Sequence, residues 1–244
     1  MASSAALKDD LVLLVEGEEI PCCKEALRNT CEYFNAMFTS QMRETTASSI
    51  ELKDVSLHSM KWLVEFSKDP NRNKFKFEDV TDACQILHTA CVLQCLGVIG
   101  VASKYVKARL SPDNCLNVMC LADMHALNHL YNLSRRKALW EFPSVSLTTE
   151  FLELSVEIVK DYLSCNMLNA ASEKAVLDAA VRWVEFDLDS RKDCYCDILS
   201  CVRLNDVGCE VLMPYLIRQS VLENPQAQQA IAQAVDQNLQ TAVS

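Results

Sequence analysis

The chain has 244 residues, a formal net charge of −10 and 50% apolar residues, so it is long and apolar enough to bury one or two hydrophobic cores. The negative charge argues against nucleic acids and anionic membrane surfaces as partners, because both attract clustered Lys and Arg side chains. No apolar run approaches the roughly 18 residues of a membrane-spanning helix, and the N-terminal residues lack the apolar centre of a secretion signal. We therefore expect a cytoplasmic protein, with the nucleus as a second compartment.

The N-terminal part of the chain alternates between short strands and short helices. Leu11–Val15 predicts a strand, and the turn at Glu16-Gly17-Glu18 leads to a second strand near Ile20. Two short helical segments are expected before Glu44, and Ser49–Leu52 predicts a third strand. The second helical segment carries apolar side chains spaced to lie on one helical face, namely Tyr33, Phe34, Ala36, Met37 and Phe38.

Helices are expected to dominate the rest of the chain. A helix over Leu57–Phe66 precedes a polar, proline-containing loop over 68–76. Further helices are predicted at about 79–93, 97–108, 113–126, 128–141, 149–154, 156–164, 173–188, 191–200, 208–219 and 225–239. Because the strands come early and the helices late, the predicted fold class is α+β followed by an all-α region. The boundary is expected near Ser111-Pro112-Asp113, a sequence that favours the start of a helix.

The segment from Glu18 to Glu44 resembles the BTB/POZ domain, in which strand, turn and a Tyr-Phe-x-x-Met-Phe helix occur in this order, here at Tyr33–Phe38. In the members that recruit cullin-3, a hydrophobic-x-Glu triplet follows, and Met42-Arg43-Glu44 stands in that place. The resemblance implies that Met42 enters an apolar pocket on cullin-3 and that Glu44 accepts hydrogen bonds there. Phe38 is expected to support this loop from below.

The helical region after Ser111 is similar to the BACK domain. The matching residues follow the BACK pattern in order, and they include Asn114-Cys115-Leu116, Ala122-Asp123, Leu130, Phe151-Leu152, Val176-Leu177, Ala179-Ala180, Trp183-Val184, Asp187, Arg191, Val202-Arg203-Leu204 and Asn224-Pro225. The chain thus resembles the BTB–BACK part of a Kelch-like protein without its Kelch propeller, over residues 9–239. The resemblance implies a BTB/POZ domain over 9–108 and an all-α, helical-hairpin BACK domain over 109–244. Within the BACK part, we expect Trp183 in the core and an ion pair between Asp178 and Arg182 on the outer face.

The chain departs from the family pattern at four places, one of which is Cys31-Glu32, where the pattern has a serine before Pro-Tyr-Phe. Cys23 stands where the pattern has histidine, and Lys68-Asp69-Pro70 replaces a Tyr-Thr-Gly sequence whose tyrosine contacts cullin in other members. Only nine residues precede Asp10, so the sequence has no counterpart of the N-terminal helix that BTB homodimers exchange. We therefore expect either a monomer or an atypical dimer.

Thirteen cysteines are scattered along the chain without any C-x-x-C pair, which excludes zinc ribbons and thioredoxin-type motifs. Most are expected to be small buried apolar residues, and the spacing of Cys84, Cys91 and Cys95 is that of one helical face. Cys23 is the candidate redox-sensitive thiol, because the neighbouring Lys24 ammonium can lower a thiol pKa.

The sequence contains no motif that is typical of a catalytic site. The four glycines form no phosphate-binding loop. His125 and His129 have the spacing of a zinc-binding pair on a helix, but the segment between them lacks the glutamate of a zinc protease. We therefore expect no catalytic activity, cofactor or metal.

Two functions remain. The first is a protein-interaction adaptor, the substrate-receptor component of a cullin-3 RING ubiquitin ligase, with an unknown protein substrate bound either by further domains of a longer protein or by the BACK surface. The second is a non-ligase scaffold or regulator that binds a structural or transcriptional partner.

Overall fold

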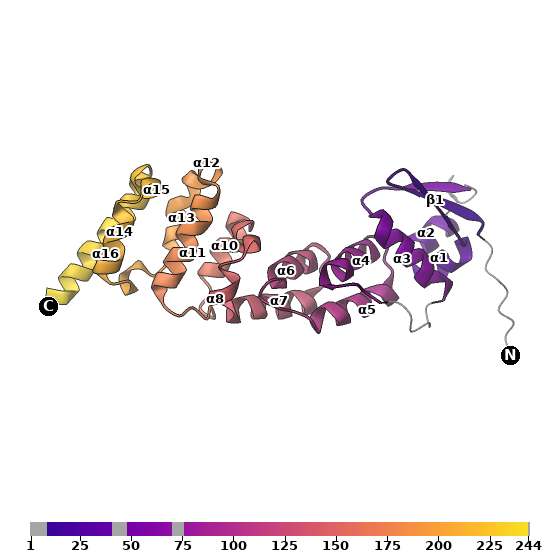
Figure 1. Ribbon diagram of the computed structural model, residues 1–244, viewed down its shortest axis with the longest axis horizontal. Coiled ribbons are helices and arrows are strands. Elements are labelled where there is room, and N and C mark those ends of the chain that lie inside the picture. Colours follow the sequence, from indigo (N-terminus) through magenta and orange to yellow (C-terminus); the bar gives the residue numbers. More distant parts are fainter. Residues whose placement is uncertain (1–8, 41–47, 70–75, 244) are drawn as a thin grey trace. The chain divides into compact units, whose positions relative to one another are not determined.

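The computed structural model describes residues 9–40, 48–69 and 76–243, with side chains described up to residue 240 (Figure 1). The chain forms two compact units. The first comprises Met1–Leu110 and Val118–Leu133, and the second comprises Ser111–Asn117 and Ser134–Ser244. Within the described part of the chain, no helix has the length and apolar character needed to span a lipid bilayer.

A small sheet forms one part of the first unit. Its strands are β1 (Leu11–Val15), β2 (Glu18–Cys22) and β3 (Ser49–Leu52), in the order β2-β1-β3. Leu13 lies opposite Ile20 in the antiparallel β1–β2 pair and opposite Ile50 in the parallel β1–β3 pair. The turn residues Glu16 and Gly17 both have positive φ, 53° and 84°, as a two-residue type I′ hairpin requires.

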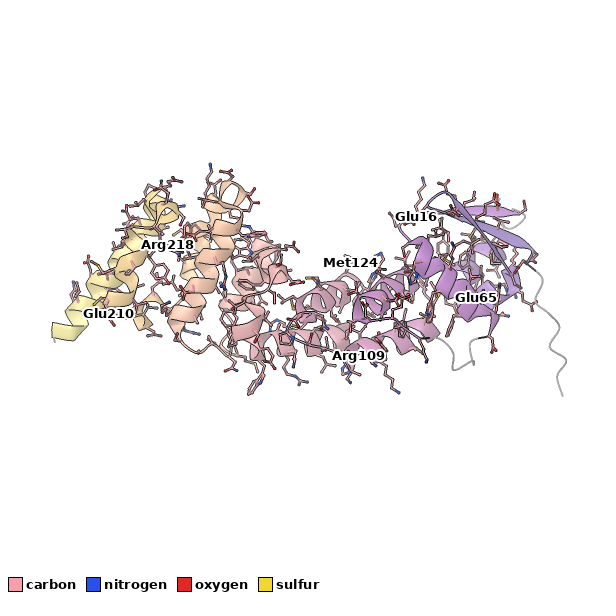
Figure 2. All side chains as sticks on the ribbon, viewed as in Figure 1. Glu16, Glu65, Arg109, Met124, Glu210 and Arg218 are labelled. Carbon is pink, nitrogen blue, oxygen red and sulfur yellow. A yellow bond between two sulfur atoms is a disulfide. The ribbon has the colours of Figure 1, made fainter. Side chains whose placement is uncertain are left out.

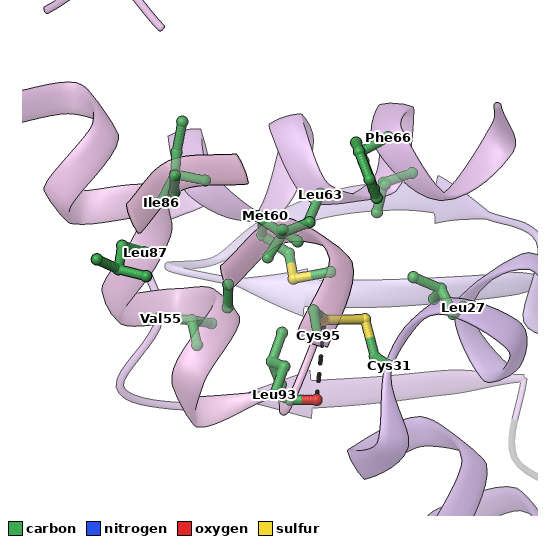
Figure 3. Packing of buried hydrophobic residues seen from close by; sticks show 14 of the residues in the cluster. Leu27, Cys31, Val55, Met60, Leu63, Phe66, Ile86, Leu87, Leu93 and Cys95 are labelled. Atoms are coloured by element: carbon green, nitrogen blue, oxygen red, sulfur yellow. Dashed lines mark hydrogen bonds between the residues drawn. A yellow bond between two sulfur atoms is a disulfide. The ribbon is translucent and has the colours of Figure 1, made fainter. Parts of the chain in front are cut away.

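Five helices complete most of the first unit: α1 (Lys24–Thr30), α2 (Glu32–Thr39), α3 (Leu57–Lys68), α4 (Val80–Val92) and α5 (Leu96–Lys107). Ser56 and Asp79 cap α3 and α4, because each side chain accepts a hydrogen bond from the backbone N–H three residues later. The helices and the sheet enclose one hydrophobic core, part of which is drawn in Figure 3 around Met60, Leu63 and Leu87.

Two helices carry residues of both units: α6 (Cys115–Met124) and α7 (Asn128–Trp140). The buried Val118, Ala122 and Leu130 belong to the core of the first unit. The helix predicted to begin at 113 begins at Cys115 instead, because the preceding residues form a turn in which Asn114 Oδ1 accepts a hydrogen bond from Ser111 N at 2.9 Å. The domain boundary between 108 and 109 stays a prediction.

Among its described residues, the second unit contains helices and their connections but no strand. Its helices are α8 (Phe142–Val145), α9 (Thr149–Leu152), α10 (Val156–Leu163), α11 (Glu173–Phe186), α12 (Leu188–Arg191), α13 (Tyr195–Ser200), α14 (Cys209–Leu216), α15 (Gln219–Leu222) and α16 (Pro225–Val243), with 3-10 turns at Lys192–Cys194 and Leu204–Asp206. Trp183 of α11 is buried, and its Nε1 donates a hydrogen bond to Leu154 O at 3.0 Å. The prediction that Trp183 is a core residue is confirmed.

The predicted ion pair between Asp178 and Arg182 is wrong. Asp178 instead pairs with Lys174 and accepts a hydrogen bond from the Tyr215 hydroxyl. Arg182 Nη2 donates to Ser146 O at 2.7 Å. The Lys174–Asp178 pair has helical spacing, but the contacts of Asp178 with Tyr215 and of Arg182 with Ser146 join residues far apart in sequence. Helical spacing alone does not reveal these two contacts.

The predicted fold class is confirmed: a small α+β unit with one sheet precedes a helical region. The strands at Leu11–Val15 and Ser49–Leu52 begin and end where the sequence analysis places them.

Candidate protein-docking site

The helix that precedes the predicted docking triplet is held firmly in the core. Phe34 and Phe38 of α2 are buried, and their stacked rings have centroids 5.8 Å apart. The Lys24 ammonium lies 4.5 Å from the centroid of the Phe38 ring, a cation–π contact that closes the outer side of the ring. Phe38 is therefore a structural residue at the end of α2, and its support of a docking loop stays a prediction.

Hydrogen bonds hold the backbone on both sides of the segment 41–47. At the end of α2, Ser40 N donates to Ala36 O at 3.0 Å and Ser40 Oγ donates to Met37 O at 2.8 Å. On the other side, Ser48 O accepts a hydrogen bond from Val12 N at 3.0 Å, next to the β1–β3 pairing. Met42 and Glu44, the predicted contact residues, lie outside the described residues.

Asp10 has a role that the sequence analysis missed. Its Oδ1 accepts a hydrogen bond from Lys24 N at 2.8 Å, although the residue that precedes α1 is Cys23, whose side chain provides no cap. Asp10, the residue before β1, thus satisfies a backbone N–H at the start of α1.

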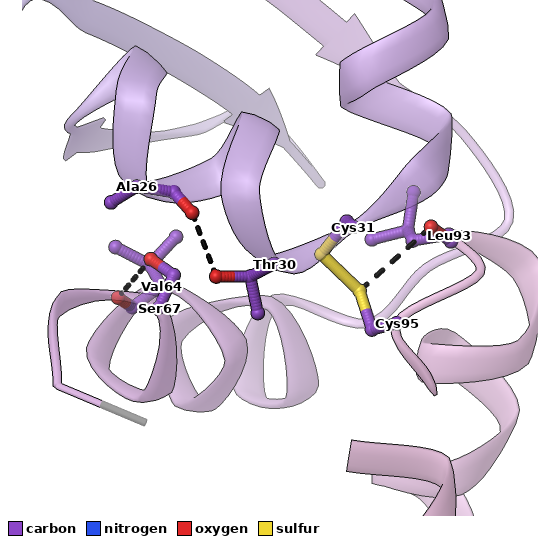
Figure 4. Close-up of a disulfide and its surroundings, with 7 residues drawn as sticks. All are labelled: Ala26, Thr30, Cys31, Val64, Ser67, Leu93 and Cys95. Atoms are coloured by element: carbon purple, nitrogen blue, oxygen red, sulfur yellow. Dashed lines mark hydrogen bonds between the residues drawn. A yellow bond between two sulfur atoms is a disulfide. The ribbon is translucent and has the colours of Figure 1, made fainter. Parts of the chain in front are cut away.

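A disulfide between Cys31 and Cys95 links the α1–α2 junction to the connection between α4 and α5 (Figure 4). Two backbone hydrogen bonds of 3.3 Å, from Glu32 N to Gln94 O and from Tyr33 N to Leu93 O, join the same segments. The prediction that Cys84, Cys91 and Cys95 share one helical face is therefore wrong for Cys95. The helix α4 ends at Val92, and Gln94, which follows it, has a positive φ of 53°. The start of α2 is held by a covalent bond.

The other cysteines are less buried than expected. Cys22, Cys23, Cys31, Cys95 and Cys115 are buried, and the remaining eight are half-buried. Burial raises the pKa of Cys22 to about 12 and that of Cys115 to about 11, so both thiols stay protonated and unreactive near neutral pH. The Cys23 side chain is 5% exposed, and the Lys24 ammonium lies over Phe38. A redox role for Cys23 stays a prediction.

The two histidines singled out in the sequence do not share a helix. His125 follows the end of α6, whereas His129 lies in α7. His125 Nε2 lies 2.8 Å from His88 Nδ1, and His129 Nε2 lies 3.1 Å from Lys107 Nζ. Burial and the neighbouring His88 lower the pKa of His125. Among the residues described, His, Cys, Asp and Glu side chains form no cluster that could hold a metal ion.

Comparison with known proteins adds family information to this geometry. The BTB/POZ domain model matches residues 5–110, and the model named "BTB And C-terminal Kelch" (BACK) matches residues 115–216. Kelch-like protein 17 of Homo sapiens is 30% identical over 218 residues, which are 88% of this chain and 33% of that protein. Kelch-like protein 2 of Mus musculus is 30% identical over 89% of this chain and 36% of its own length.

Kelch repeat and BTB domain-containing protein 2 of Homo sapiens is 30% identical over 80% of this chain and 31% of its own length. The chain thus spans about a third of the length of these curated relatives. The three strands of the described residues form one small sheet and no propeller. The chain belongs to the BTB–BACK proteins, and its relatives are Kelch-like proteins.

Proposed function

We propose that this chain is a protein-interaction adaptor that docks cullin-3 through Met42-Arg43-Glu44 and acts as the substrate-receptor component of a cullin-3 RING ubiquitin ligase. The observation that supports it best is the anchoring of the flanking backbone: the buried Phe38 lies in the last turn of α2, and Ser48 O accepts a hydrogen bond from Val12 N of β1. Fixed flanks reduce the entropy lost when a short segment binds a partner.

The chemistry of the triplet fits this role. A methionine side chain can fill an apolar pocket and supply affinity, whereas a carboxylate at the edge of an interface fixes its orientation. The neighbouring core also contains the disulfide of Cys31, so α2 is tied at its first turn as well as at its last. Catalysis belongs to other subunits of the assembly.

Titration of the chain with the N-terminal domain of cullin-3 tests the proposal. We expect Met42→Ala and Glu44→Ala each to weaken binding at least about tenfold, as truncation of a central contact residue does. Gln41→Ala, in the same segment, serves as the matched control and should bind like the wild type. Equal binding by the wild type and by both variants, or no binding by the wild type, would contradict the proposal.

One observation favours the second function, a scaffold or regulator outside the ligase system. Where other members carry the cullin-contacting tyrosine, Lys68 lies within ion-pair distance of Glu65, at 3.5 Å, and of Asp9, at 3.8 Å. A lysine held by two carboxylates does not replace an aromatic contact. If cullin-3 shows no binding, this alternative takes the place of the first proposal.

A further inference from the structure

An open groove with a volume of about 510 Å³ lies on the first unit, where the outer face of α5 meets the residues that lead into α4. It is lined by Lys76, Phe77, Val101, Lys104, Tyr105, Ala108 and Arg109. Four of these residues lie at positions i, i+3, i+4 and i+7 of α5 and its C-cap, so they form one stripe along the helix. The buried face of the same helix carries Val98, Ala102 and Val106.

The floor of the groove is apolar and rigid. Val101 is 47% exposed, so its apolar side chain is accessible to a partner. The Tyr105 ring packs against Phe77 with 4.8 Å between centroids, and Phe77 stacks on Trp62 at 5.4 Å. The Arg109 guanidinium, at the end of α5 (Figure 2), lies 3.7 Å from the centroid of the Tyr105 ring. The aromatic row therefore holds the groove open and orients a cation at its rim.

Among the described residues that line the groove, every ionisable group other than the Tyr105 hydroxyl is a cation, namely Lys76, Lys104 and Arg109. Within the described part of the chain, no carboxylate forms an ion pair with Lys76 or Lys104. Glu78 and Asp79 follow Phe77 but do not line the groove, and Asp79 caps α4. This concentration of positive charge stands out in a chain with a net charge of −10.

We propose that this groove binds an acidic peptide segment of a partner protein, with an apolar side chain placed between two or more carboxylates. The apolar side chain would lie on Val101 and Tyr105, and the carboxylates would pair with Lys104 and Lys76. Interfaces combine apolar anchors with complementary charges in this way to obtain affinity and orientation. The inference goes beyond the proposed function, because it involves no residue of the Met42–Glu44 triplet.

Fluorescence anisotropy of the full chain with a fluorescein-labelled Asp-Glu-Leu-Leu-Asp-Glu peptide tests the proposal. We expect saturable binding that weakens as salt is added. An Asn-Gln-Leu-Leu-Asn-Gln peptide and an Asp-Glu-Ser-Ser-Asp-Glu peptide should each bind at least about tenfold more weakly, because they lack the charge or the anchor.

Variants localise the binding. Lys104→Glu and Val101→Ser are exposed substitutions, and each should reduce affinity about tenfold, whereas Lys192→Glu makes the same charge change in the second unit and should have no effect. Met42→Ala should bind the peptide like the wild type, which separates this result from that of cullin-3 docking.

Absence of saturable binding up to about 1 mM peptide, or equal binding by Lys104→Glu and wild type, would overturn the proposal. Concentration-dependent self-association that Lys104→Glu abolishes in sedimentation equilibrium would also overturn it, and would assign the groove to a second copy of this acidic chain.

Discussion

Cys31 and Cys95 are 64 residues apart in sequence, and their disulfide joins the first turn of α2 to the connection between α4 and α5 (Figures 3 and 4). Both side chains are buried, at 1% and 0% exposure. The bond crosses the core of the first unit next to Leu27 and Leu93. It therefore adds a covalent link between two segments that two backbone hydrogen bonds and the shared hydrophobic core also join.

Loss of this disulfide should destabilise the first unit. Because the bond closes a 64-residue separation, the chain-entropy model gives a contribution of about 4 kcal/mol. We expect reductant to lower the urea midpoint of the wild type, and the Cys31→Ser/Cys95→Ser double variant to have the lower midpoint with or without reductant. Cys201→Ser, which removes a half-buried thiol outside this pair, is the control and should respond to reductant like the wild type. A wild-type midpoint that reductant leaves unchanged would show that the bond contributes nothing.

The Asp10 carboxylate should stabilise α1. Replacing Asp10 by Ala removes the acceptor for Lys24 N, and we expect a loss of about 1 kcal/mol in the free energy of unfolding, as for other helix-capping side chains. Asp9→Ala is the control, because Asp9 makes only an exposed contact of 3.8 Å with Lys68 and such pairs contribute little. Urea unfolding followed by circular dichroism measures both variants. Equal losses for the two would refute the capping role.

Trp183 should dominate the core of the second unit. Trp183→Ala removes a side chain that is 2% exposed and that donates to Leu154 O, so we expect a loss of about 3–5 kcal/mol. The Arg191 guanidinium, 3.9 Å from the centroid of the same indole ring, loses its cation–π partner as well. Trp140→Ala is the matched control, because Trp140 is 68% exposed. Thermal unfolding should shift for the first variant and stay within experimental error for the second.

The His88–His125 pair should make the first unit sensitive to acid. Burial, and then His88, lower the pKa of His125 below its ordinary value of 6.5. The unfolded chain therefore binds more protons than the folded chain just below pH 6.5, and stability should fall as the pH decreases from 6.5 through the folded-state pKa. His125→Gln should flatten this part of the stability curve, measured by urea unfolding at a series of pH values. An unchanged slope in the His125→Gln variant would contradict this prediction.

Local patterns in the sequence predicted the elements well. Alternating apolar residues sufficed for β1, and the three- and four-residue spacing around Trp183 identified its helix as a core element, since burial follows the period of the secondary structure. Capping signals were less reliable: Ser111 precedes a turn, and α6 begins only at Cys115.

Local sequence patterns did not predict the contacts between residues that are far apart in the chain. Thirteen cysteines allow many pairings, so nothing in their spacing distinguishes Cys31 and Cys95. The same holds for Asp178 with Tyr215, and for the aromatic contact of Phe77 with Tyr105 that shapes the groove on α5. The predicted docking residues Met42 and Glu44 were identified by family resemblance, and their contacts stay predictions.

The interleaving of the two units has a practical consequence for how this protein can be divided. Residues 111–117 belong to the second unit and 118–133 to the first, so the chain passes from one unit to the other three times. A fragment cut after residue 110, where the BTB/POZ match ends, would leave the first unit without the apolar side chains of Val118, Ala122 and Leu130. A recombinant fragment that extends to residue 133 retains these three side chains. The fragment that ends at residue 110 should aggregate, because it exposes the apolar surface that they cover.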